Sequence, residues 1–438
     1  MLNILRKITP RAVKRFYHYF LAIFANFYYG SPSDKLIVIG VTGTSGKSTV
    51  VYLITKILEQ AGFKVGAVST IIFKVDKKEK LNDKKMTMIG RFALQKMIKK
   101  MVKANCQYAI IETTSEGIEQ YRHLGINYDV LVFTNLYPEH IEAHGSFANY
   151  KKAKLKLFAK LKTDRPKLIT GNKIKKTIIV NLDDEHGKDF LAHQAEEKLG
   201  FSLLGRTLGA ENSIVAENSS SGSAGGKFTI NKQEFNLKLL GQHNIYNALA
   251  AVAVCKSQQL SLSSIAKGLA MVESVPGRLE FIDQGQLFKV IVDYAFEPKA
   301  TQALYDIVKL ISHKKIIHVL GAAGGGRDKS RRLILGQFAG ANADIVIVTN
   351  EDPYDEDPGE IINTVWLGAK KAGKKNNKDL FKVADRGEAI SQAINLAKPH
   401  DVVLITGKGS EQAIVTKGGK IIPWDDRQFA KSEIDKTL

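Results

Sequence analysis

A glycine-rich turn between an apolar run and a helix-like segment constrains this chain more than any other feature. The β-branched run at residues 35–39 predicts a strand that ends at Gly40, and the apolar spacing of residues 49–61 predicts a helix. Between them lies the turn GTSGKS at residues 43–48. The backbone N–H groups of such a turn, with the N-terminus of the next helix, form a cradle for anions. The sequence therefore predicts that the chain binds a nucleoside triphosphate.

Two side chains of the turn suit this chemistry. Lys47 would reach the outer phosphates, and the Ser48 hydroxyl would ligate Mg²⁺. Val41 stands where the common eight-residue loop has a glycine, so the match is to the shorter pattern Gly-Thr-x-Gly-Lys-Ser/Thr. An ordinary glycine-rich turn without a ligand is the alternative, and the flanking strand and helix favour phosphate binding.

Length and cysteine usage limit the class of protein. The 438 residues allow two or three domains, and a 44% hydrophobic content is enough for ordinary cores. Cys106 and Cys255 cannot form a disulfide framework or a four-cysteine zinc site. Their apolar surroundings predict buried thiols, which fits a reducing cytoplasm.

The net charge of +20 would suit nucleic acid, an anionic membrane surface or an anionic substrate. The lysines lie in short, scattered clusters, with no basic stripe interleaved with aromatic residues. We therefore expect no nucleic-acid partner.

The N-terminal segment is basic and then aromatic. Its basic residues are Arg6, Lys7, Arg11, Lys14 and Arg15. The apolar run Phe16–Tyr29 is too short to cross a bilayer comfortably. Three interpretations stay open: a helix docked on the protein's own surface, an interfacial membrane helix, or a signal peptide. No small-residue cleavage site follows, which disfavours the signal peptide.

Strand-like and helix-like segments alternate after the turn, which is typical of a parallel α/β sheet. We expect strands at 108–111 and 130–133, helices at 147–161 and 239–256, and a mobile Ser/Gly-rich loop at 212–227. A boundary near residues 275–277 precedes a second series, with strands at 290–292, 316–320, 345–348 and 402–405. The predicted fold is α/β: an N-terminal helical segment (1–34), a central ATP-binding domain with a mostly parallel sheet (35–275) and a Rossmann-like C-terminal domain (276–438).

Polar residues follow several of these strands. Glu112 follows residues 108–111, Asn135 follows residues 130–133 with His140 five positions later, and Asp293 follows residues 290–292. Ligands of open α/β sheets bind at strand ends, and Mg²⁺ prefers oxygen ligands. Together with the turn, these residues predict a Mg²⁺–phosphate site.

At this point the sequence resembles the Mur ligases, and among them the UDP-N-acetylmuramyl-tripeptide synthetases. The resemblance runs from about residue 35 to the C-terminus. Its motifs are TNL (134–136), EHIEAHG (139–145), YKKAKLKLF (150–158), ETTSEG (112–117), LGQHNIYN (240–247), PGRLE (276–280), VDYA (292–295), GGRDK (325–329), DP (352–353) and GKGSE (407–411).

The resemblance implies roles for ATP-site residues. Those expected to bind ATP are Gly43, Thr44, Ser45, Gly46, Lys47, Ser48, Thr49, Asn244, Asn247, Arg278 and Asp293. Those expected to be catalytic are Lys47, Glu112, His140 and Lys154, and those expected to ligate Mg²⁺ are Ser48, Glu112, His140 and Lys154. Lys154 matches a lysine that the family carbamylates with CO₂, and a carbamate turns an amine into an oxygen ligand. Without the resemblance, Lys154 reads as a surface lysine.

The resemblance also implies the substrate site. The acceptor peptide would meet Thr87, Thr114, Gln120 and Arg122. The incoming amino acid would meet Arg327, Asp352, Gly407 and Glu411. Family members that add diaminopimelate have Asp-Asn-Pro-Arg where this chain has Glu351, Asp352, Pro353 and Tyr354. Without that arginine clamp, two acids favour a cationic, lysine-like side chain. Phe296 and Ser410 replace two family histidines.

The implied activity is ATP-dependent addition of an amino acid to a muramyl-peptide precursor of peptidoglycan, through an acyl phosphate. The family's N-terminal UDP-binding domain is expected to be missing, because about 34 residues precede the central domain. The acceptor could therefore be UDP-linked, lipid-linked or free. A folylpolyglutamate synthase-like substrate or an ATP-dependent switch is the alternative. We expect a cytoplasmic monomer, with a peripheral membrane contact through Phe16–Tyr29.

Overall fold

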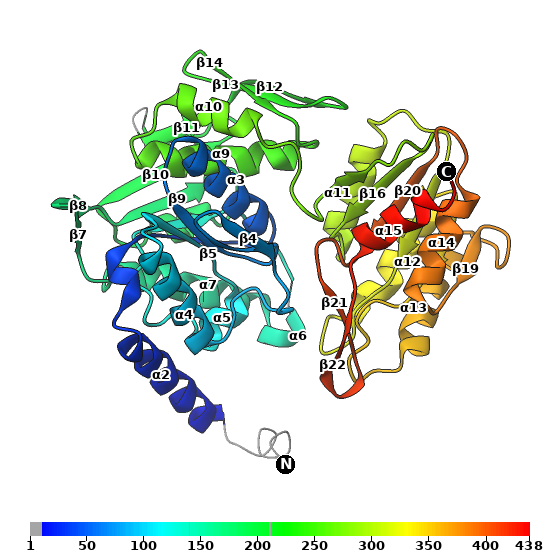
Figure 1. Ribbon diagram of the computed structural model, residues 1–438, viewed down its shortest axis with the longest axis horizontal. Coiled ribbons are helices and arrows are strands. Elements are labelled where there is room, and N and C mark those ends of the chain that lie inside the picture. Colours follow the sequence, from blue (N-terminus) through cyan, green and yellow to red (C-terminus); the bar gives the residue numbers. More distant parts are fainter. Residues whose placement is uncertain (1–10, 140, 210–211) are drawn as a thin grey trace.

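The computed structural model describes residues 11–139, 141–209 and 212–438. The described residues form two α/β units that lie side by side, each with a central sheet covered by helices (Figure 1). Each unit is called a layer below. The first follows the N-terminal helix α2 (Arg11–Tyr28), and the second begins after residue 275. Among the described residues, no helix has the length and apolarity needed to cross a membrane.

The first sheet is parallel from β11 to β2 and antiparallel at the β2–β3–β4 edge. In spatial order its strands are β11 (Ser213–Val215), β10 (Glu197–Ser202), β9 (Thr177–Asn181), β6 (Val130–Phe133), β1 (Ile37–Thr42), β5 (Tyr108–Glu112), β2 (Val65–Val68), β3 (Ile72–Val75) and β4 (Lys78–Leu81). The expectation of a mostly parallel sheet is confirmed.

Side chains on the two faces of this sheet belong to two separate hydrophobic cores. Ile39 and Val41 of β1 point into one core, and Val38 points into the other, as the two-residue period of a strand requires. The first core lies under α3 (Lys47–Gln60), α9 (Gln242–Ser257) and α10 (Leu262–Ala270). The second lies under α4 (Arg91–Lys103), α5 (Ser115–Glu119), α7 (Phe147–Leu161) and α8 (Gly187–Leu191), and the short α6 (Ile141–His144) precedes α7.

The second layer has a six-stranded sheet, parallel apart from its β15 edge. Its order is β15 (Glu280–Ile282), β16 (Lys289–Asp293), β20 (Val402–Thr406), β17 (Ile316–Leu320), β18 (Ile345–Val348) and β19 (Leu380–Lys382). Helices α11 (Pro298–Val308), α12 (Ser330–Asn342) and α13 (Pro358–Lys371) cover one face, and α14 (Arg386–Leu396) and α15 (Asp426–Asp435) cover the other. Two small hairpins lie outside the two large sheets: β7 (Lys167–Ile169) with β8 (Asn172–Ile174), and β21 (Ala413–Thr416) with β22 (Lys420–Pro423).

The prediction of a mobile loop at residues 212–227 is wrong. Most of it forms β11, β12 (Glu217–Gly222) and the start of β13 (Gly225–Ile230), and β13 also pairs with β14 (Gln233–Leu237). Backbone pairing needs no particular side chain, and Phe228 and Phe235 stack with ring centroids 4.9 Å apart to anchor the hairpin. A Ser/Gly-rich composition therefore does not exclude a strand whose neighbour is well packed.

Strand β1 continues beyond Gly40, where the sequence predicts its end. It runs to Thr42 because β5 and β6 pair with it on both sides, with Val41 opposite Glu112 and Thr42 opposite Phe133. This register brings the ends of β1, β5 and β6 to one edge of the sheet.

Candidate active site

The turn between β1 and α3 is a tight backbone cradle. A Cβ atom at Gly43 would lie 1.9 Å from Thr134 Oγ1, so a larger residue does not fit there. Gly46 has φ 79° and immediately precedes α3, whose first N–H groups open onto the turn. Asn135 Oδ1 accepts a hydrogen bond from Ser45 N at 2.9 Å and holds the turn against the end of β6. The predicted phosphate cradle is thus a compact turn at a sheet edge.

Glu112 gathers hydroxyl groups beside the cradle. Its Oε2 accepts hydrogen bonds from Ser48 Oγ at 2.8 Å, Thr70 N at 2.8 Å and Thr70 Oγ1 at 3.1 Å. Thr87 Oγ1 lies 2.7 Å from Thr70 Oγ1. This oxygen-rich group fits a hard cation such as Mg²⁺, which takes one or two carboxylates and keeps waters. Ser48 and Glu112, both expected metal ligands, are therefore neighbours.

Lys154 of α7 lies behind the cradle and is only 1% exposed. Its Nζ donates to Gly43 O at 2.7 Å and lies 4.5 Å from the centroid of the Tyr150 ring. Among the described residues, no carboxylate lies within 4.0 Å of this amine. Burial first, and then the charge of Lys47, hold the pKa of Lys154 well below its usual value. The interpretation of Lys154 as a surface lysine is wrong.

Lys47 lies at the mouth of the same cradle. Its Nζ donates to Thr44 O at 2.8 Å. Burial lowers the pKa of Lys47, Glu112 opposes that shift, and Arg278 of the second layer adds to it. Charged groups of both layers therefore affect the pKa of Lys47. His140 lies outside the described residues.

Two asparagines expected to bind ATP, Asn244 and Asn247, lie close to the turn. Asn247 Oδ1 would be 2.3 Å from a Cβ atom at Gly46, and Asn247 Nδ2 donates to Asn244 Oδ1 at 2.9 Å. Asn244 Nδ2 in turn donates to Leu240 O at 2.8 Å. Both side chains belong to α9 and are buried.

Arg278 and Asp293 lie where the second layer begins. The Arg278 guanidinium stacks 4.2 Å above the Tyr294 ring centroid, and its Nη1 donates to Gly277 O at 3.0 Å. Asp293 accepts hydrogen bonds from Leu279 N at 2.6 Å and Ala295 N at 2.7 Å, and burial raises its pKa. Its carboxylate thus fixes the turn that carries Arg278.

The expected acceptor residues border the Glu112 group. Thr114 caps α5 by accepting from Gly117 N at 3.1 Å. Arg122 Nη2 donates to Gln120 Oε1 at 2.6 Å, and Arg122 Nη1 donates to Met88 O, next to Thr87. The structure therefore brings Thr87, Gln120 and Arg122 into one connected group.

An ion cluster joins the two layers at the expected amino-acid site. Lys408 Nζ lies 2.9 Å from both Asp352 Oδ1 and Glu411 Oε2. Lys85, from the loop after β4, lies 2.5 Å from Asp352 Oδ2 and also contacts Glu411. Burial lowers the pKa of Lys85, although the two acids oppose the shift.

The acidic pair differs from the one that the sequence suggests. Burial raises the pKa of Glu351, whose carboxyl group packs against Gly407. Asp352 with Glu411, rather than Glu351 with Asp352, therefore faces an ammonium group. Burial lowers the pKa of nearby Arg327, but its charged and phenolic neighbours, with Tyr294 and Tyr354 the strongest, together raise the pKa by more. Arg327 thus lies within the same charged group.

Further contacts close the gap between the layers near the cradle. Tyr137 Oη donates to Glu297 Oε1 at 2.7 Å, and Arg331 forms an ion pair with Glu139 at 3.2 Å. Glu142 of α6 accepts from Lys329 N at 2.9 Å, and α6 faces the second layer in Figure 1. The cradle and the ion cluster therefore both lie where the two layers meet.

Sequence reasoning missed Thr70, Tyr150 and Lys85. Thr70 follows β2, whose end shares the edge of β1 and β5, so the strand-end argument could have found it. Tyr150 Oη donates to Thr44 Oγ1 at 3.1 Å, and its spacing of four from Lys154 puts both on one helix face. Lys85 has no signal in the sequence, because its partners are more than 260 positions away.

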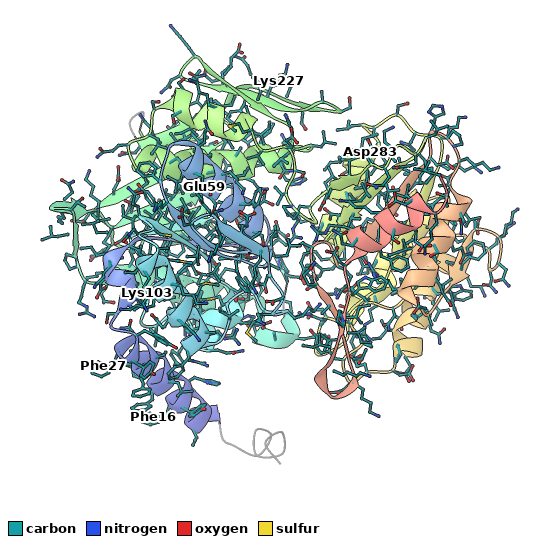
Figure 2. The ribbon with its side chains drawn as sticks, in the orientation of Figure 1. Phe16, Phe27, Glu59, Lys103, Lys227 and Asp283 are labelled. Atoms are coloured by element: carbon teal, nitrogen blue, oxygen red, sulfur yellow. The ribbon has the colours of Figure 1, made fainter. Side chains whose placement is uncertain are left out.

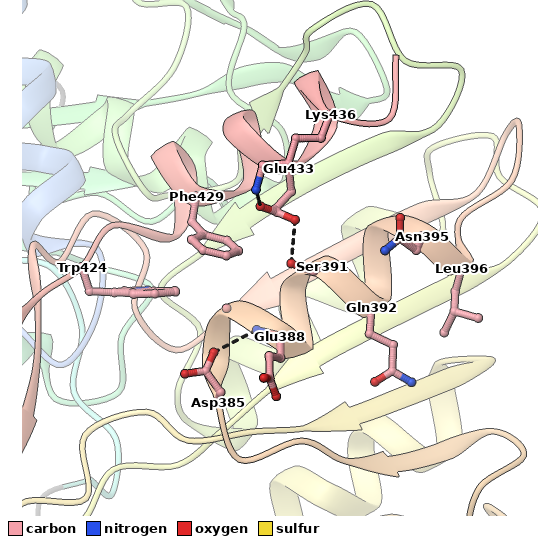
Figure 3. A pocket seen from close by; sticks show the side chains of 11 residues that line it. Asp385, Glu388, Ser391, Gln392, Asn395, Leu396, Trp424, Phe429, Glu433 and Lys436 are labelled. Atoms are coloured by element: carbon pink, nitrogen blue, oxygen red, sulfur yellow. Dashed lines mark hydrogen bonds and ion pairs between the residues drawn. The ribbon is translucent and has the colours of Figure 1, made fainter.

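A separate hollow lies between α14 and α15 (Figure 3). Trp424 and Phe429 stack in it at 5.0 Å, and Ser391 donates to Glu433 at 2.7 Å. It contains none of the expected site residues.

A phosphate cradle and a second α/β layer that meet at a charged site define a two-domain nucleotide-dependent enzyme. Two family models match: the Mur ligase middle domain over residues 41–255, and the Mur ligase glutamate ligase domain over residues 277–409. The chain belongs to the Mur ligase family, and it is an ATP-dependent ligase that forms amide bonds.

Individual relatives agree. A UDP-N-acetylmuramyl-tripeptide synthetase of a Roseiflexus species is 35% identical over 94% of this chain and 81% of its own length. A UDP-N-acetylmuramoyl-L-alanyl-D-glutamate–2,6-diaminopimelate ligase of Clostridium tetani is 33% identical over 95% and 81%. A solved structure of a ligase with the same name superposes with a TM-score of 0.58 at 26% identity, over 92% of this chain and 79% of that chain.

Proposed function

We propose that this chain joins an amino acid to a muramyl-peptide precursor of peptidoglycan and uses ATP to activate the peptide carboxylate. The observation that carries the proposal is that two groups face each other where the layers meet: the phosphate cradle with Glu112 on one layer, and Asp352 with Glu411 on the other. The relatives' names supply the substrate class.

In the proposed reaction, an acceptor carboxylate oxygen attacks the γ-phosphorus of ATP, and ADP leaves. The amino group of the second substrate then attacks the acyl carbon, loses a proton, and phosphate leaves as the amide forms. Lys47 and Arg278 neutralise the charge that spreads over the transferring phosphoryl group. Bound Mg²⁺ would neutralise further charge beside Ser48, Glu112, the modified Lys154 and His140. Contacts between the layers exclude water, which protects the acyl phosphate.

We propose that Lys154 is carbamylated. CO₂ reacts with a neutral amine, releases a proton and leaves a carboxylate-like group. A depressed pKa supplies the neutral amine, and the absence of a carboxylate partner among the described residues leaves it uncommitted. The product would place two oxygens beside the cradle.

We further propose that the added residue is a diamino acid such as lysine. The chain's own Lys85 puts a primary ammonium between Asp352 and Glu411, so these acids already accept the group that such a substrate carries. Tyr354 offers no bidentate grip on a distal carboxylate.

A phosphate-release assay with UDP-linked, lipid-linked and free muramyl dipeptides tests this proposal. We expect release to need both an acceptor and an amino acid, with lysine or ornithine preferred to diaminopimelate. A preference for diaminopimelate would refute the diamino-acid proposal, and release that ignores both substrates would refute the ligase proposal.

We also propose that the enzyme works as a monomer in the cytoplasm and touches a membrane peripherally through Phe16–Tyr29. Exposed aromatic side chains on α2 support the contact.

A further inference from the structure

Helix α2 turns small residues toward the protein and large aromatic residues toward solvent, the reverse of an ordinary surface helix. Ala22 and Ala25, which are at most 1% exposed, face the body of the protein. Phe16, Phe20 and Phe27 face outward and are 72%, 57% and 79% exposed. Figure 2 shows Phe16 and Phe27 projecting from α2. Large aromatic groups that could pack inward are thus held in solvent.

The outward residues form a continuous stripe. Phe16, Phe20, Ile23 and Phe27 follow the spacing i, i+4, i+7 and i+11, which keeps them on one face. Contiguous exposed apolar surface rimmed by polar residues is typical of interaction sites.

Helix α4 places a row of lysines beside this stripe. Phe92 of α4 contacts Phe24 and Tyr28 with ring centroids 6.0 and 6.3 Å away. Tyr28 and Phe27 line a groove with four lysines of α4, namely Lys96, Lys99, Lys100 and Lys103. Among the described residues, none of these lysines has a carboxylate within 4.0 Å.

The two sequence segments that form the groove contain no acidic residue. Neither residues 11–33 nor residues 84–111 include an Asp or Glu. The surface therefore combines aromatic side chains with unneutralised positive charge, on a chain with net charge +20. Aromatic residues suit the boundary between lipid headgroups and acyl chains, and lysines attract anionic headgroups.

The same helix lies beside the expected acceptor site. Tyr19 contacts Tyr121 with ring centroids 5.9 Å apart, between Gln120 and Arg122. A Cβ atom at Gly125 would lie 2.6 Å from Asn26 Cβ, so α2 packs closely on this segment. A surface that binds through α2 therefore lies next to the residues expected to hold the peptide.

We propose that the aromatic stripe of α2 and the lysine row of α4 form one docking surface for bilayers of anionic phospholipid. The inference rests on the membrane contact proposed above. It adds that the lipid headgroups are anionic and that lysines of α4 bind them. The aromatic side chains enter the interface, while Lys96, Lys99, Lys100 and Lys103 bind headgroup phosphates and thereby hold the acceptor site at the membrane surface.

Vesicle sedimentation of the full chain tests this surface. We compare phosphatidylcholine vesicles with vesicles that contain about 30% phosphatidylglycerol, an anionic phospholipid. Binding is measured at low salt and in about 0.5 M salt, which strongly screens charge. We expect at least about tenfold tighter binding to the anionic vesicles, weakened by salt.

Three variants separate the contributions. Replacing the four α4 lysines with Gln should remove the preference for anionic vesicles, and Phe16→Ala with Phe20→Ala, two residues of the stripe, should weaken binding to all vesicles. The matched control replaces Lys370, Lys371, Lys374 and Lys375 with Gln, which removes the same charge from α13 and the segment after it. Wild-type binding by this control is expected, and an equal loss in it would overturn the proposal, because net charge alone would then explain binding.

Two other results would also overturn it: equal binding to neutral and anionic vesicles, or self-association through α2 in sedimentation velocity without lipid. Ligase turnover with a free muramyl peptide is measured on each variant. In the wild type, turnover without vesicle binding would refute the docking surface and leave the proposed reaction standing, whereas vesicle binding without turnover would refute the reaction alone.

Discussion

Lys154 is the residue whose chemistry depends most on its surroundings. Its Nζ is buried, donates to Gly43 O and lies over the Tyr150 ring, and burial strongly lowers its pKa. The sequence alone could not predict this, because a lysine in a lysine-rich helix usually faces solvent. Burial is a property of how α7 packs behind the cradle.

Carbamylation of Lys154 predicts a specific spectroscopic signal. With ¹³C-bicarbonate, the wild type should show a carbamate carbonyl resonance, and Lys154→Ala should lose it together with at least about 100-fold of ligase turnover, as expected when a metal ligand is removed. Lys152→Ala, an exposed neighbour on α7, is the control and should keep both. An unchanged resonance in Lys154→Ala would contradict the assignment.

His318 reports on the core of the second layer. It is fully buried between Tyr305 Oη at 2.6 Å and Thr406 Oγ1 at 2.9 Å, and burial lowers its pKa to about 3. Below pH 6.5 the unfolded chain gains a proton that the folded chain does not, so stability falls as the pH drops.

For this single group, the loss of unfolding free energy between pH 7 and pH 5.5 is about 1 kcal/mol. Urea unfolding at both pH values measures it. His318→Asn should reduce the pH dependence by that amount, and His400→Asn, at an exposed site, should keep the wild-type dependence. Equal slopes in all three proteins would show that His318 does not titrate as its burial requires.

At the scale of elements, the sequence predicts long, strongly patterned segments well. Helix α7 spans the predicted residues 147–161, and Ser146 caps it by accepting from Asn149 N. The prediction fails at residues 212–227, where pairing with β14 and β10 outweighs a loop-like composition. Neither partner strand is visible from the local sequence, so local patterns could not reveal the sheet.

Phe92 anchors α2 and makes an element-scale prediction. Its ring contacts Phe24, Tyr28 and Tyr29. Phe92→Ala should speed amide hydrogen exchange in residues 16–30 by about tenfold, because losing these partly buried contacts costs roughly 1–2 kcal/mol. ATP turnover should not change. Phe281→Ala, exposed on β15, is the control, and unchanged exchange in Phe92→Ala would show that α2 is held elsewhere.

At the scale of the whole molecule, the proposed function requires that the two layers meet. Strand-end residues such as Glu112 and Asn135 were predictable, since parallel strands share an edge. The ion cluster of Lys85 with Asp352 and Glu411 was not, because no local pattern places a loop of one layer against strand ends of the other. The family resemblance supplied Asp352 and Glu411, and the structure supplied Lys85.

The central claim is that ATP activates an acceptor carboxylate for amide formation at the interlayer site. Isotope transfer tests it most directly: a muramyl dipeptide with an ¹⁸O-labelled terminal carboxylate is incubated with ATP, Mg²⁺ and lysine, and the products are weighed by mass spectrometry. Because the attacking oxygen leaves with the phosphoryl group, we predict one ¹⁸O atom in the phosphate released for each amide formed. Unlabelled phosphate, or ADP formed without amide, would contradict the account.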